Sequence, residues 1–359
     1  MRMKVAVLGG GHGAHAAAAD LAVAGHEVVL WRRDGAALRA LGTPPAIVLK
    51  DAAGARDVPL AGASADIGAA VRGAALIVCP LPATAQDDVA RALAPHLVDG
   101  QVVFLPPGSF GSFAMARIVR AAGNPARVAW AETGTLPYLA RKHGPREVNV
   151  SARAVRLPTG VYPAKDAARA IEVVRRAFPS VHACGDALSA ALMNAGPIIH
   201  TPLVVMNAAP LEHFERWDIH AEGTQASVRA VTDRLDRERI AVREALGFGV
   251  PHYPLADHYA NDRWMYGDAH RALVKSGDWR EHIDLHTHRY VREDGEIGLA
   301  LLASVARWAG VDAPLAEGLL AVLGAILGRD LRQGARTFEA LGLAALTRAE
   351  LHERLHDGD

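Results

Sequence analysis

The sequence predicts an α/β protein with a doubly wound parallel sheet at the N-terminus and an all-helical domain after it. Short apolar runs typical of buried strands alternate with helical runs up to about residue 185. A glycine cluster directly follows the first apolar run. From residue 186 onward the helical pattern continues without a clear strand. The predicted domains are therefore residues 1–185 and residues 186–359.

The glycine cluster lies between a predicted strand at residues 4–8 and a predicted helix at residues 15–23. Its spacing, G-x-G-x-x-A, is carried by Gly9, Gly11 and Ala14. Between a strand and a helix this is the dinucleotide-binding fingerprint of the Rossmann fold, although an ordinary glycine-rich turn is the alternative. Phosphates would bind over the helix N-terminus, where free N–H groups and the helix dipole favour negative charge. The predicted cofactor contacts here are Gly9, Gly10, Gly11, His12, Gly13 and Ala14.

The residues after the second predicted strand, 27–31, favour NADP(H) over NAD(H). An NAD enzyme of this fold usually has Asp or Glu at this strand end to bond the ribose hydroxyl. Here the chain has Arg32 and Arg33, whose guanidinium groups match a 2′-phosphate. Asp34 leaves the NAD alternative open, because a shifted turn would bring its carboxylate to the ribose.

Composition and charge exclude several classes of protein. Lys plus Arg and Asp plus Glu balance at 39 each, so nothing in the net charge points to nucleic acid or to an anionic membrane. Two cysteines, Cys79 and Cys184, imply no disulfide framework and fit a cytoplasmic protein. The first predicted strand begins at once, so no signal peptide is expected. The apolar run 313–327 is too short to span a bilayer and predicts a buried helix.

Other strand ends of the N-terminal half supply further candidates, because ligands bind at the carboxyl edge of such sheets. Pro80 and Leu81 follow the strand at residues 75–79 and are predicted to contact the cofactor. A second glycine-rich corner, residues 106–112, follows the strand at 101–105. Glu132 and Thr133 end the strand at 128–133, where a site role and a structural role are equally supported.

The helical half holds two polar segments within apolar surroundings. Residues 188–205 are helical in character but contain Pro197 and Pro202, which bend or break a helix interior. His200 follows the first of these prolines and is either a hydrogen-bonded core histidine or a site residue. Residues 286–298 concentrate ionisable groups before an apolar helix, where Asp294 is either a helix cap or part of an acid–base site. His282, His286 and His288 match no standard zinc spacing, so no metal is predicted.

At this point the chain resembles the octopine/nopaline (opine) dehydrogenase family over most of its length. Four segments carry the resemblance: Val7-Leu-Gly-Gly-Gly-His-Gly-Ala-His-Ala16, Glu132-Thr-Gly-Thr-Leu-Pro-Tyr138, Asn194-Ala-Gly-Pro-Ile-Ile-His200-Thr-Pro202 with Met206-Asn207, and His288-Arg289-Tyr-Val-Arg-Glu-Asp294. The last two are the specific ones. The resemblance implies a Rossmann domain that binds NAD(H) or NADP(H), and a helical substrate domain of the 6-phosphogluconate dehydrogenase C-terminal type. It also implies reductive condensation of an amino acid with a 2-oxo acid.

The resemblance also assigns roles to particular residues. The catalytic histidine of the family matches His200, its carboxylate partner matches Asp294, and its substrate-binding arginine matches Arg289. Asn194 and Thr133 complete the predicted substrate contacts. Relatives often carry a more apolar, proline-containing stretch where this chain has residues 295–298, which leaves the amino substrate open. The expected partners are an amino acid and a 2-oxo acid, with no nucleic acid and no membrane, and a homodimer is a further expectation.

Two other readings remain as alternatives. One is a dehydrogenase of a 2-hydroxy acid or of a polyol phosphate, for which glycerol-3-phosphate and 6-phosphogluconate dehydrogenases are models. Those enzymes need a lysine early in the second domain, whereas this chain has no lysine between Lys165 and Lys275. The other is a non-catalytic NADP-binding sensor, which would not need His200 and Asp294 to meet. We therefore expect these two side chains to lie within one hydrogen bond or one water of each other.

Overall fold

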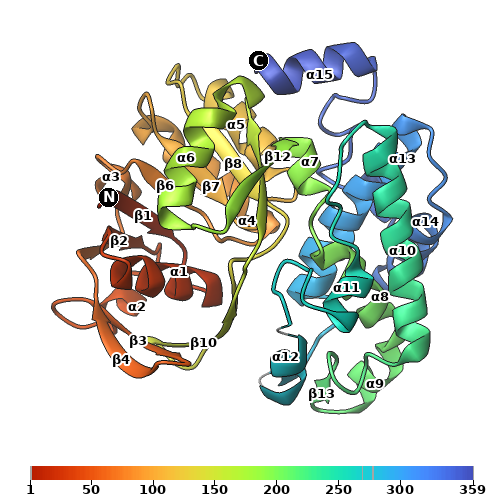
Figure 1. Ribbon diagram of the computed structural model, residues 1–359, viewed down its shortest axis with the longest axis horizontal. Helices are drawn as coiled ribbons and strands as arrows, with labels where there is room; N and C mark the ends of the chain where they lie inside the picture. Colours follow the sequence, from red (N-terminus) through yellow and green to blue (C-terminus); the bar gives the residue numbers. More distant parts are fainter. Residues whose placement is uncertain (1, 269, 277–278, 359) are drawn as a thin grey trace. The chain divides into compact units, whose positions relative to one another are not determined.

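The N-terminal unit of the computed structural model is built on an eight-stranded sheet (Figure 1). The strand order is β12-β11-β8-β7-β6-β1-β2-β5, and neighbours run parallel except β8 and β11. The predicted fold class is confirmed, with one antiparallel pair added. The strands are β1 (Lys4–Leu8), β2 (Glu27–Trp31), β5 (Gly62–Ser64), β6 (Leu76–Val78), β7 (Val102–Leu105), β8 (Ala129–Thr133), β11 (Leu157–Tyr162) and β12 (Val181–Asp186). The structure describes residues 2–268, 270–276 and 279–358.

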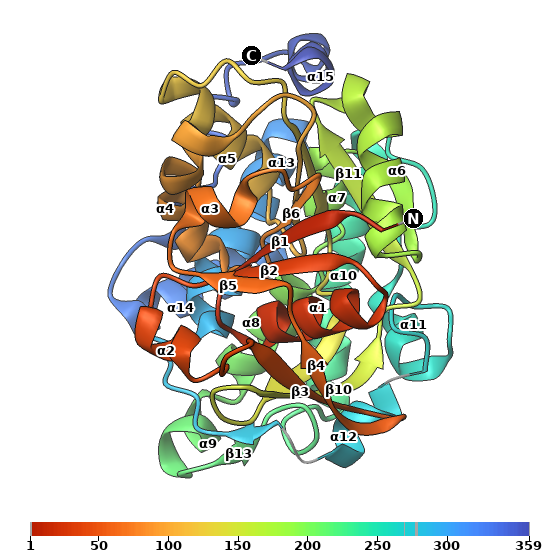
Figure 2. The same cartoon turned by 90° about the vertical axis from the view of Figure 1, so that its left-hand side faces the viewer.

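A second sheet, with the order β4-β3-β10-β9, lies on the other side of helix α1 (His12–Val23), as Figure 2 shows. Alanine fills most of the buried positions of α1, and this small side chain lets both sheets approach the helix. The alternating strand and helix pattern of the sequence did not predict this separate sheet. The strands are β3 (Ala46–Asp51), β4 (Gly54–Pro59), β9 (Tyr138–Lys142) and β10 (Glu147–Arg153).

A buried carboxylate ties this small sheet to α1. Asp51, at the end of β3, accepts bonds from both terminal nitrogens of Arg56, at 2.8 and 3.0 Å. Arg153 donates to Asp51 at 2.8 Å and to Asp20 of α1 at 2.7 Å. The Arg56 bonds, helped by Arg153, hold the pKa of Asp51 well below its usual range. The cluster is therefore stable as long as the Asp51 carboxylate is ionised.

The other helices of this unit cover the large sheet. They are α2 (Gly35–Arg39), α3 (Ile67–Val71), α4 (Ala83–Leu93), η1 (Ala94–His96), α5 (Gly111–Ala121), η2 (Ala164–Asp166), α6 (Ala167–Ala177) and α7 (Ala187–Ala191). Contacts divide the chain after Ala191, six residues beyond the predicted boundary, because α7 still packs on β11 and β12. The tail from Arg354 also belongs to this unit.

The second unit, Leu192–Glu353, is mainly helical. Its helices are α8 (Gly196–Met206), α9 (Ala208–His213), α10 (Ala226–Ala245), α11 (Leu255–Ala260), α12 (His270–Ser276), η3 (Tyr290–Leu299), α13 (Ala300–Ala309), α14 (Pro314–Leu327) and η4 (Leu331–Gln333), and α15 (Arg348–Asp357) crosses into the tail. The sequence predicted no strand here, but two-residue strands β13 (Trp217–Asp218) and β14 (Arg280–Glu281) pair antiparallel.

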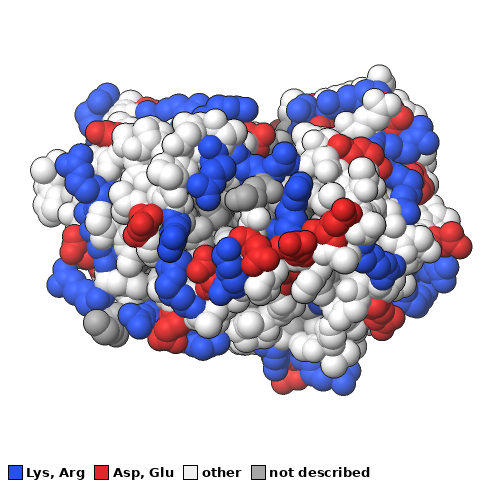
Figure 3. All heavy atoms as spheres, turned by 90° about the horizontal axis from the view of Figure 1, so that it is seen from above, with Lys and Arg blue, Asp and Glu red and all other residues white. Residues whose placement is uncertain are grey.

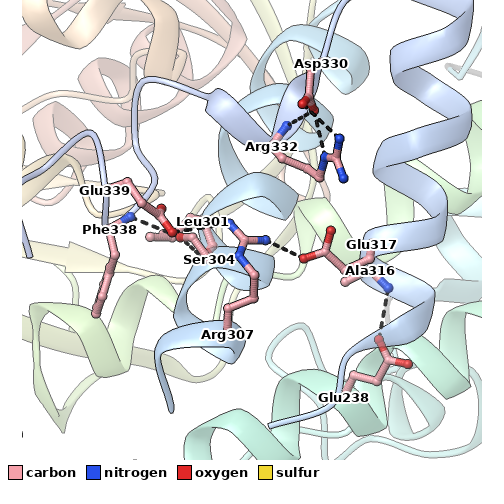
Figure 4. Close-up of polar contacts among 10 residues, drawn as sticks. All are labelled: Glu238, Leu301, Ser304, Arg307, Ala316, Glu317, Asp330, Arg332, Phe338 and Glu339. Carbon is pink, nitrogen blue, oxygen red and sulfur yellow. Dashed lines mark hydrogen bonds and ion pairs between the residues drawn. The ribbon is translucent and has the colours of Figure 1, made fainter. Parts of the chain in front are cut away.

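Charged side chains, one buried and others at the surface, connect helices α10, α13 and α14 of this unit (Figure 4). Glu238 of α10 is buried and accepts bonds from the backbone N–H groups of Leu315 and Ala316, both at 3.0 Å. Its carboxylate therefore caps the first turn of α14, where the helix dipole favours negative charge. Arg307 of α13 pairs with Glu317 of α14, which joins the two helices at the surface.

One stretch, Ala187–Met206, is long and apolar enough to cross a membrane by length and composition alone. Of its most apolar window, 78% is buried inside the protein, and core helices pass the same test. The run at 313–327, which the sequence predicts as a buried helix, forms α14 with one buried side. On the face in Figure 3, Lys and Arg are interspersed with Asp and Glu, in keeping with the zero net charge.

Candidate functional site

The predicted glycine corner links β1 to α1. Gly9 has φ +125°, a conformation that favours glycine and turns the chain directly after the strand. Gly11 is the N-cap of α1, and a β-carbon added to it would meet no protein atom within 4 Å. Ala14 is fully buried under the sheet. The corner thus has open space above the first N–H groups of a helix, which suits a phosphate group.

Two cations flank this corner. Arg32 follows β2, and a β-carbon on Gly10 would lie 2.2 Å from its Nε atom. Lys142 of β9 donates from Nζ to the carbonyl of Gly10 at 3.3 Å, and its backbone N–H donates to Nδ1 of His12 at 2.8 Å. Partial burial, and then the charge of Arg32, lower the pKa of Lys142. Within the described residues neither cation forms an ion pair with a carboxylate, so the corner fits the phosphates of a dinucleotide.

Sequence reasoning missed Lys142. It lies 110 residues after Arg32, on a strand of the separate small sheet, and no local pattern links it to the glycine corner. The neighbouring Arg33 is exposed. Asp34, which left the NAD alternative open, accepts bonds with Oδ1 from the backbone N–H groups of Ala36 and Ala37 and so caps α2.

The segment after β6, which holds Pro80 and Leu81, lies against the same corner. A β-carbon on Gly13 would lie 3.2 Å from Cβ of Pro80, and one on Gly9 would lie 2.9 Å from Cδ2 of Leu81. The glycines at these positions therefore also allow the loop after β6 to approach. Cys79 just before it is buried, and this burial raises the pKa of its thiol, as expected for a packing residue.

The second glycine-rich corner is filled by the protein itself. Glu132, at the end of β8, accepts bonds from the backbone N–H groups of Phe110 and Ser112, both at 2.8 Å. A β-carbon on Gly108 would lie 2.5 Å from its Oε2 atom, so glycine is needed for this approach. Glu132 therefore has a structural role. Thr133 beside it is fully buried, and its Oγ1 has no hydrogen-bond partner in the structure.

In the helical unit, α8 and η3 pack closely through glycine. η3 is a π-helix, so Asp294 lies inside a helix and does not cap one. A β-carbon on Gly295 would lie 2.4 Å from Leu323, and one on Gly298 would lie 2.2 Å from Pro197. Asn194 precedes α8, and its Oδ1 accepts the backbone N–H of Gly196 at 3.0 Å. π-Helical turns are rare and occur often at functional sites.

The contact expected between His200 and Asp294 is present. Nδ1 of His200 lies 2.7 Å from Oδ2 of Asp294, and the side chains are 14% and 6% exposed. Burial raises the pKa of the Asp294 carboxyl to about 7, while the charge of Arg289 opposes the shift. A carboxylate bonded to Nδ1 fixes the tautomer of the imidazole and stabilises its charged form, leaving Nε2 as the atom that exchanges protons.

Two aromatic neighbours of His200 were not predicted. The Tyr290 ring is stacked on the imidazole, with centroids 3.7 Å apart and planes 15° apart. The Tyr290 hydroxyl lies 3.1 Å from Nε2 of His220. A period of 3.6 residues does not reveal this arrangement, because the i→i+5 bonds of η3 alter which residues share a side.

Arg289 precedes η3 and is half-exposed, with 53% of its side chain accessible. Its guanidinium lies 5.4 Å from the Tyr290 ring centre and 4.0 Å from a carboxylate oxygen of Glu293. The helical unit thus brings together four of the predicted site residues, namely His200, Asp294, Arg289 and Asn194. Thr133 and the cofactor contacts belong to the N-terminal unit. Across the described part of the chain, no three His, Cys, Asp or Glu side chains are grouped to hold a metal ion.

Comparisons with known proteins show the family of the chain. The family model for the NAD/NADP octopine/nopaline dehydrogenase α-helical domain matches residues 183–327. The opine dehydrogenase of Arthrobacter sp. (strain 1C) is 30% identical over 96% of both chains. The chain belongs to the opine dehydrogenase family. Vitopine synthase of Allorhizobium ampelinum is a further relative, 27% identical over 95% of each chain.

Solved structures show the same fold. An octopine dehydrogenase structure with NADH and pyruvate superposes with a TM-score of 0.69 at 18% identity, covering 96% of this chain and 99% of that one. Yersinopine dehydrogenase with NADP⁺ bound gives a TM-score of 0.66 at 15% identity over 99% of each chain. As an opine dehydrogenase, the enzyme is an NAD(P)-dependent oxidoreductase acting on CH–NH groups. It catalyses the reductive condensation of an amino acid with a 2-oxo acid.

Proposed function

We propose that His200 and Asp294 form the acid–base pair of this condensation. The observation that carries the proposal is the 2.7 Å bond between Nδ1 of His200 and Oδ2 of Asp294. The amine of the amino acid adds to the oxo carbon, and the charged imidazole protonates the developing carbinolamine oxygen. The neutral imidazole then takes a proton from the added nitrogen and returns it to the hydroxyl group, which leaves as water, so that a protonated imine remains. When bound, NAD(P)H supplies a hydride to the imine carbon.

Arg289, Asn194 and Thr133 are proposed to hold the substrates. A guanidinium offers two parallel donors to a carboxylate, and half of the Arg289 side chain is accessible for such a bond. Thr133 has a buried hydroxyl without a partner, a state that favours a bond to a ligand over an empty site. Asn194 is buried just before α8, where its Oδ1 accepts the backbone N–H of Gly196, and it is proposed to contact substrate from this position.

The substrate classes follow from these groups. The octopine dehydrogenase structures contain pyruvate or L-arginine, together with NADH. For this chain we propose a small 2-oxo acid such as pyruvate and an amino acid, both bound through a carboxylate. The N-terminal unit is proposed to bind the dinucleotide and the helical unit to bind the substrates.

NADP(H) is proposed as the preferred cofactor. Arg32 lies against Gly10, Lys142 reaches the same residue, and neither is neutralised by a carboxylate. The Asp34 carboxylate is engaged at the start of α2. An additional phosphate on the ribose therefore meets two cations, whereas the NAD ribose lacks the usual acidic partner. Arg33 stays a second candidate for the same phosphate.

Three expectations stay predictions of this proposal: a cytoplasmic location, a homodimer, and no binding of membrane or nucleic acid. Two free cysteines favour a reducing compartment. Light scattering after gel filtration measures the oligomeric state directly.

A panel assay tests the function. Oxidation of NADPH and of NADH is followed with pyruvate or 2-oxoglutarate against each common amino acid, and the product is identified by mass spectrometry. The proposal expects turnover that needs both an amine and an oxo acid and is faster with NADPH. Turnover of a 2-hydroxy acid in the absence of any amine would replace this function with the 2-hydroxy acid alternative.

A further inference from the structure

The His200 imidazole is held on more than one side. Asp294 bonds its Nδ1, and the Tyr290 ring covers its face at 3.7 Å. His220 stands edge-on to the imidazole, with centroids 5.7 Å apart and planes 79° apart. Tyr290 is 1% exposed. One face of the mostly buried His200 imidazole is therefore covered by an aromatic ring.

The Tyr290 ring is itself fixed from two directions. Its hydroxyl lies 3.1 Å from Nε2 of His220, and this contact fixes the position of the outer end of the ring. His220 in turn packs edge-on against Trp279, with centroids 5.1 Å apart. Its backbone N–H donates to Oδ1 of Asp218, which anchors the loop after β13.

We propose that Tyr290 is a positioning residue of the acid–base pair, held in place by His220, and that its ring face favours the protonated imidazole of His200. This inference rests on the proposed role of His200. The face of an aromatic ring carries negative charge and attracts a cation lying over it. A parallel imidazolium at 3.7 Å receives that attraction only in its charged form. The stack therefore acts in the same direction as the Asp294 bond.

Among the described residues, the charged and titratable groups that face His200 include Asp294 and Tyr290 on η3 and His220 in the loop after β13. The Arg289 guanidinium lies over the same Tyr290 ring, with its carbon 5.4 Å from the ring centre. One aromatic ring thus contacts both the proposed acid and the proposed carboxylate-binding arginine. A shift of Tyr290 would disturb both groups.

Three variants test the proposal. Tyr290→Phe keeps the ring and removes the hydroxyl bond, Tyr290→Leu removes the ring, and His220→Gln keeps a side chain able to hydrogen-bond. Tyr259→Phe, an aromatic change elsewhere in the helical unit, is the matched control. The measurements are kcat and KM for each substrate, the pH dependence of kcat/KM, and the dissociation constant for NADPH by fluorescence.

We expect Tyr290→Leu to lower kcat by about ten- to a hundredfold, because the imidazole loses its fixed orientation. The limb of the kcat/KM profile on which activity falls as pH rises, where the imidazole loses its proton, should move to lower pH, since the charged imidazole loses its attraction to the ring. Tyr290→Phe should retain the ring effect and lose only a fewfold in kcat, and His220→Gln should behave like it. Affinity for NADPH should stay at the wild-type value in all three variants.

A merely structural role for Tyr290 would lower the amount of folded protein without moving the pH profile of the folded fraction. Circular dichroism and NADPH binding report that fraction, and Tyr290→Phe keeps the packed ring if Tyr290→Leu does not fold. An unchanged pH profile and kcat in a folded Tyr290→Leu protein would overturn the proposal. In that case a loss of turnover in His200→Ala would leave the proposed function intact, whereas retained turnover in His200→Ala would contradict the proposed function itself.

Discussion

The Asp294 carboxylate lies directly against the backbone of Gly196, so closely that a β-carbon on Gly196 would lie 2.1 Å from Oδ1 of Asp294. Gly196 is the first residue of α8, four residues before His200. The absence of a side chain at this one position therefore allows the carboxylate to reach the imidazole. This contact leads to the first of five predictions.

Gly196→Ala should displace the Asp294 carboxylate and lower kcat by roughly ten- to a hundredfold, as expected for a misplacement of about 1 Å. Affinity for NADPH should not change, because the glycine corner belongs to the other unit. Gly318→Ala is the control: it lies in α14, and a β-carbon there meets no atom within 4 Å. That control should keep full activity and gain about 0.5–1 kcal/mol in unfolding free energy. Equal kcat values in the two variants would contradict the prediction.

His200→Ala should lower kcat by roughly 10²- to 10⁴-fold, because the reaction loses its general acid and base. The dissociation constant for NADPH, measured by fluorescence titration, should stay near the wild-type value. His282→Ala changes an exposed histidine of the same unit and should leave both quantities unchanged. Loss of NADPH binding in His200→Ala would argue against the assignment of His200 to the chemistry.

Asp294→Asn should remove activity and alter the pH dependence of stability. Burial raises the pKa of Asp294 to about 7, so the folded protein binds this proton more tightly than the unfolded chain does. The stabilising contribution is complete below the unfolded pKa and is lost as pH rises through about 7. The Asn variant has no such loss, so its melting temperature relative to wild type should rise between pH 5 and pH 8. A constant difference across this range would refute the expected direction.

Arg32→Glu should weaken NADPH binding far more than NADH binding. It replaces a cation at the ribose end with the acidic group that NAD enzymes use, and a tenfold or larger change in the NADPH/NADH affinity ratio is expected, about 1.4 kcal/mol. Lys142→Met shows which phosphate Lys142 contacts. Weaker binding of NADPH alone indicates that Lys142 contacts the 2′-phosphate, and equally weaker binding of NADPH and NADH indicates that it contacts the pyrophosphate. Arg39→Ala, in the last turn of α2, is the control. An unchanged affinity ratio in Arg32→Glu would contradict the NADP(H) preference.

Asp51→Asn should destabilise the N-terminal unit by about 1–3 kcal/mol at pH 7, because Arg56 and Arg153 lose a charged acceptor. The pKa of Asp51 is held below its usual range, so the stabilising contribution is present above the unfolded pKa of about 4 and is lost at lower pH. The difference in unfolding free energy between Asp51→Asn and the wild type should therefore become smaller at acidic pH. Asp57→Asn, which changes an exposed partner of Arg146, is the control. It should lower the unfolding free energy measured in urea by no more than about 0.5 kcal/mol.

The elements with strong local signals were predictable from the sequence. β1 and the glycine corner follow from four buried residues and the G-x-G-x-x-A spacing. The His200–Asp294 contact followed from a family resemblance, since no local pattern joins residues 94 positions apart. The small sheet was not predicted, because β3 and β9, the partners of β10, lie in segments without a clear strand signal.

The remainder depends on three-dimensional contacts that a sequence pattern does not encode. The π-helix η3 packs through Gly295 and Gly298 against α14 and α8, whereas the sequence pattern alone suggests a helix cap at Asp294. Tyr290 and His220 come together only in that packing. Lys142 belongs to the small sheet and meets Gly10 through the fold of the whole unit.

The position of Glu132 affects where the N-terminal unit can bind anions from solution. The corner after β7 offers backbone N–H groups at the start of α5, as phosphate-binding corners do, but Glu132 already accepts the bonds from Phe110 and Ser112. This carboxylate is a tethered ligand, and its effective concentration at the corner is set by the chain and not by the cell. Free phosphates compete poorly there, so the corner after β1 is the one left to a diffusing nucleotide.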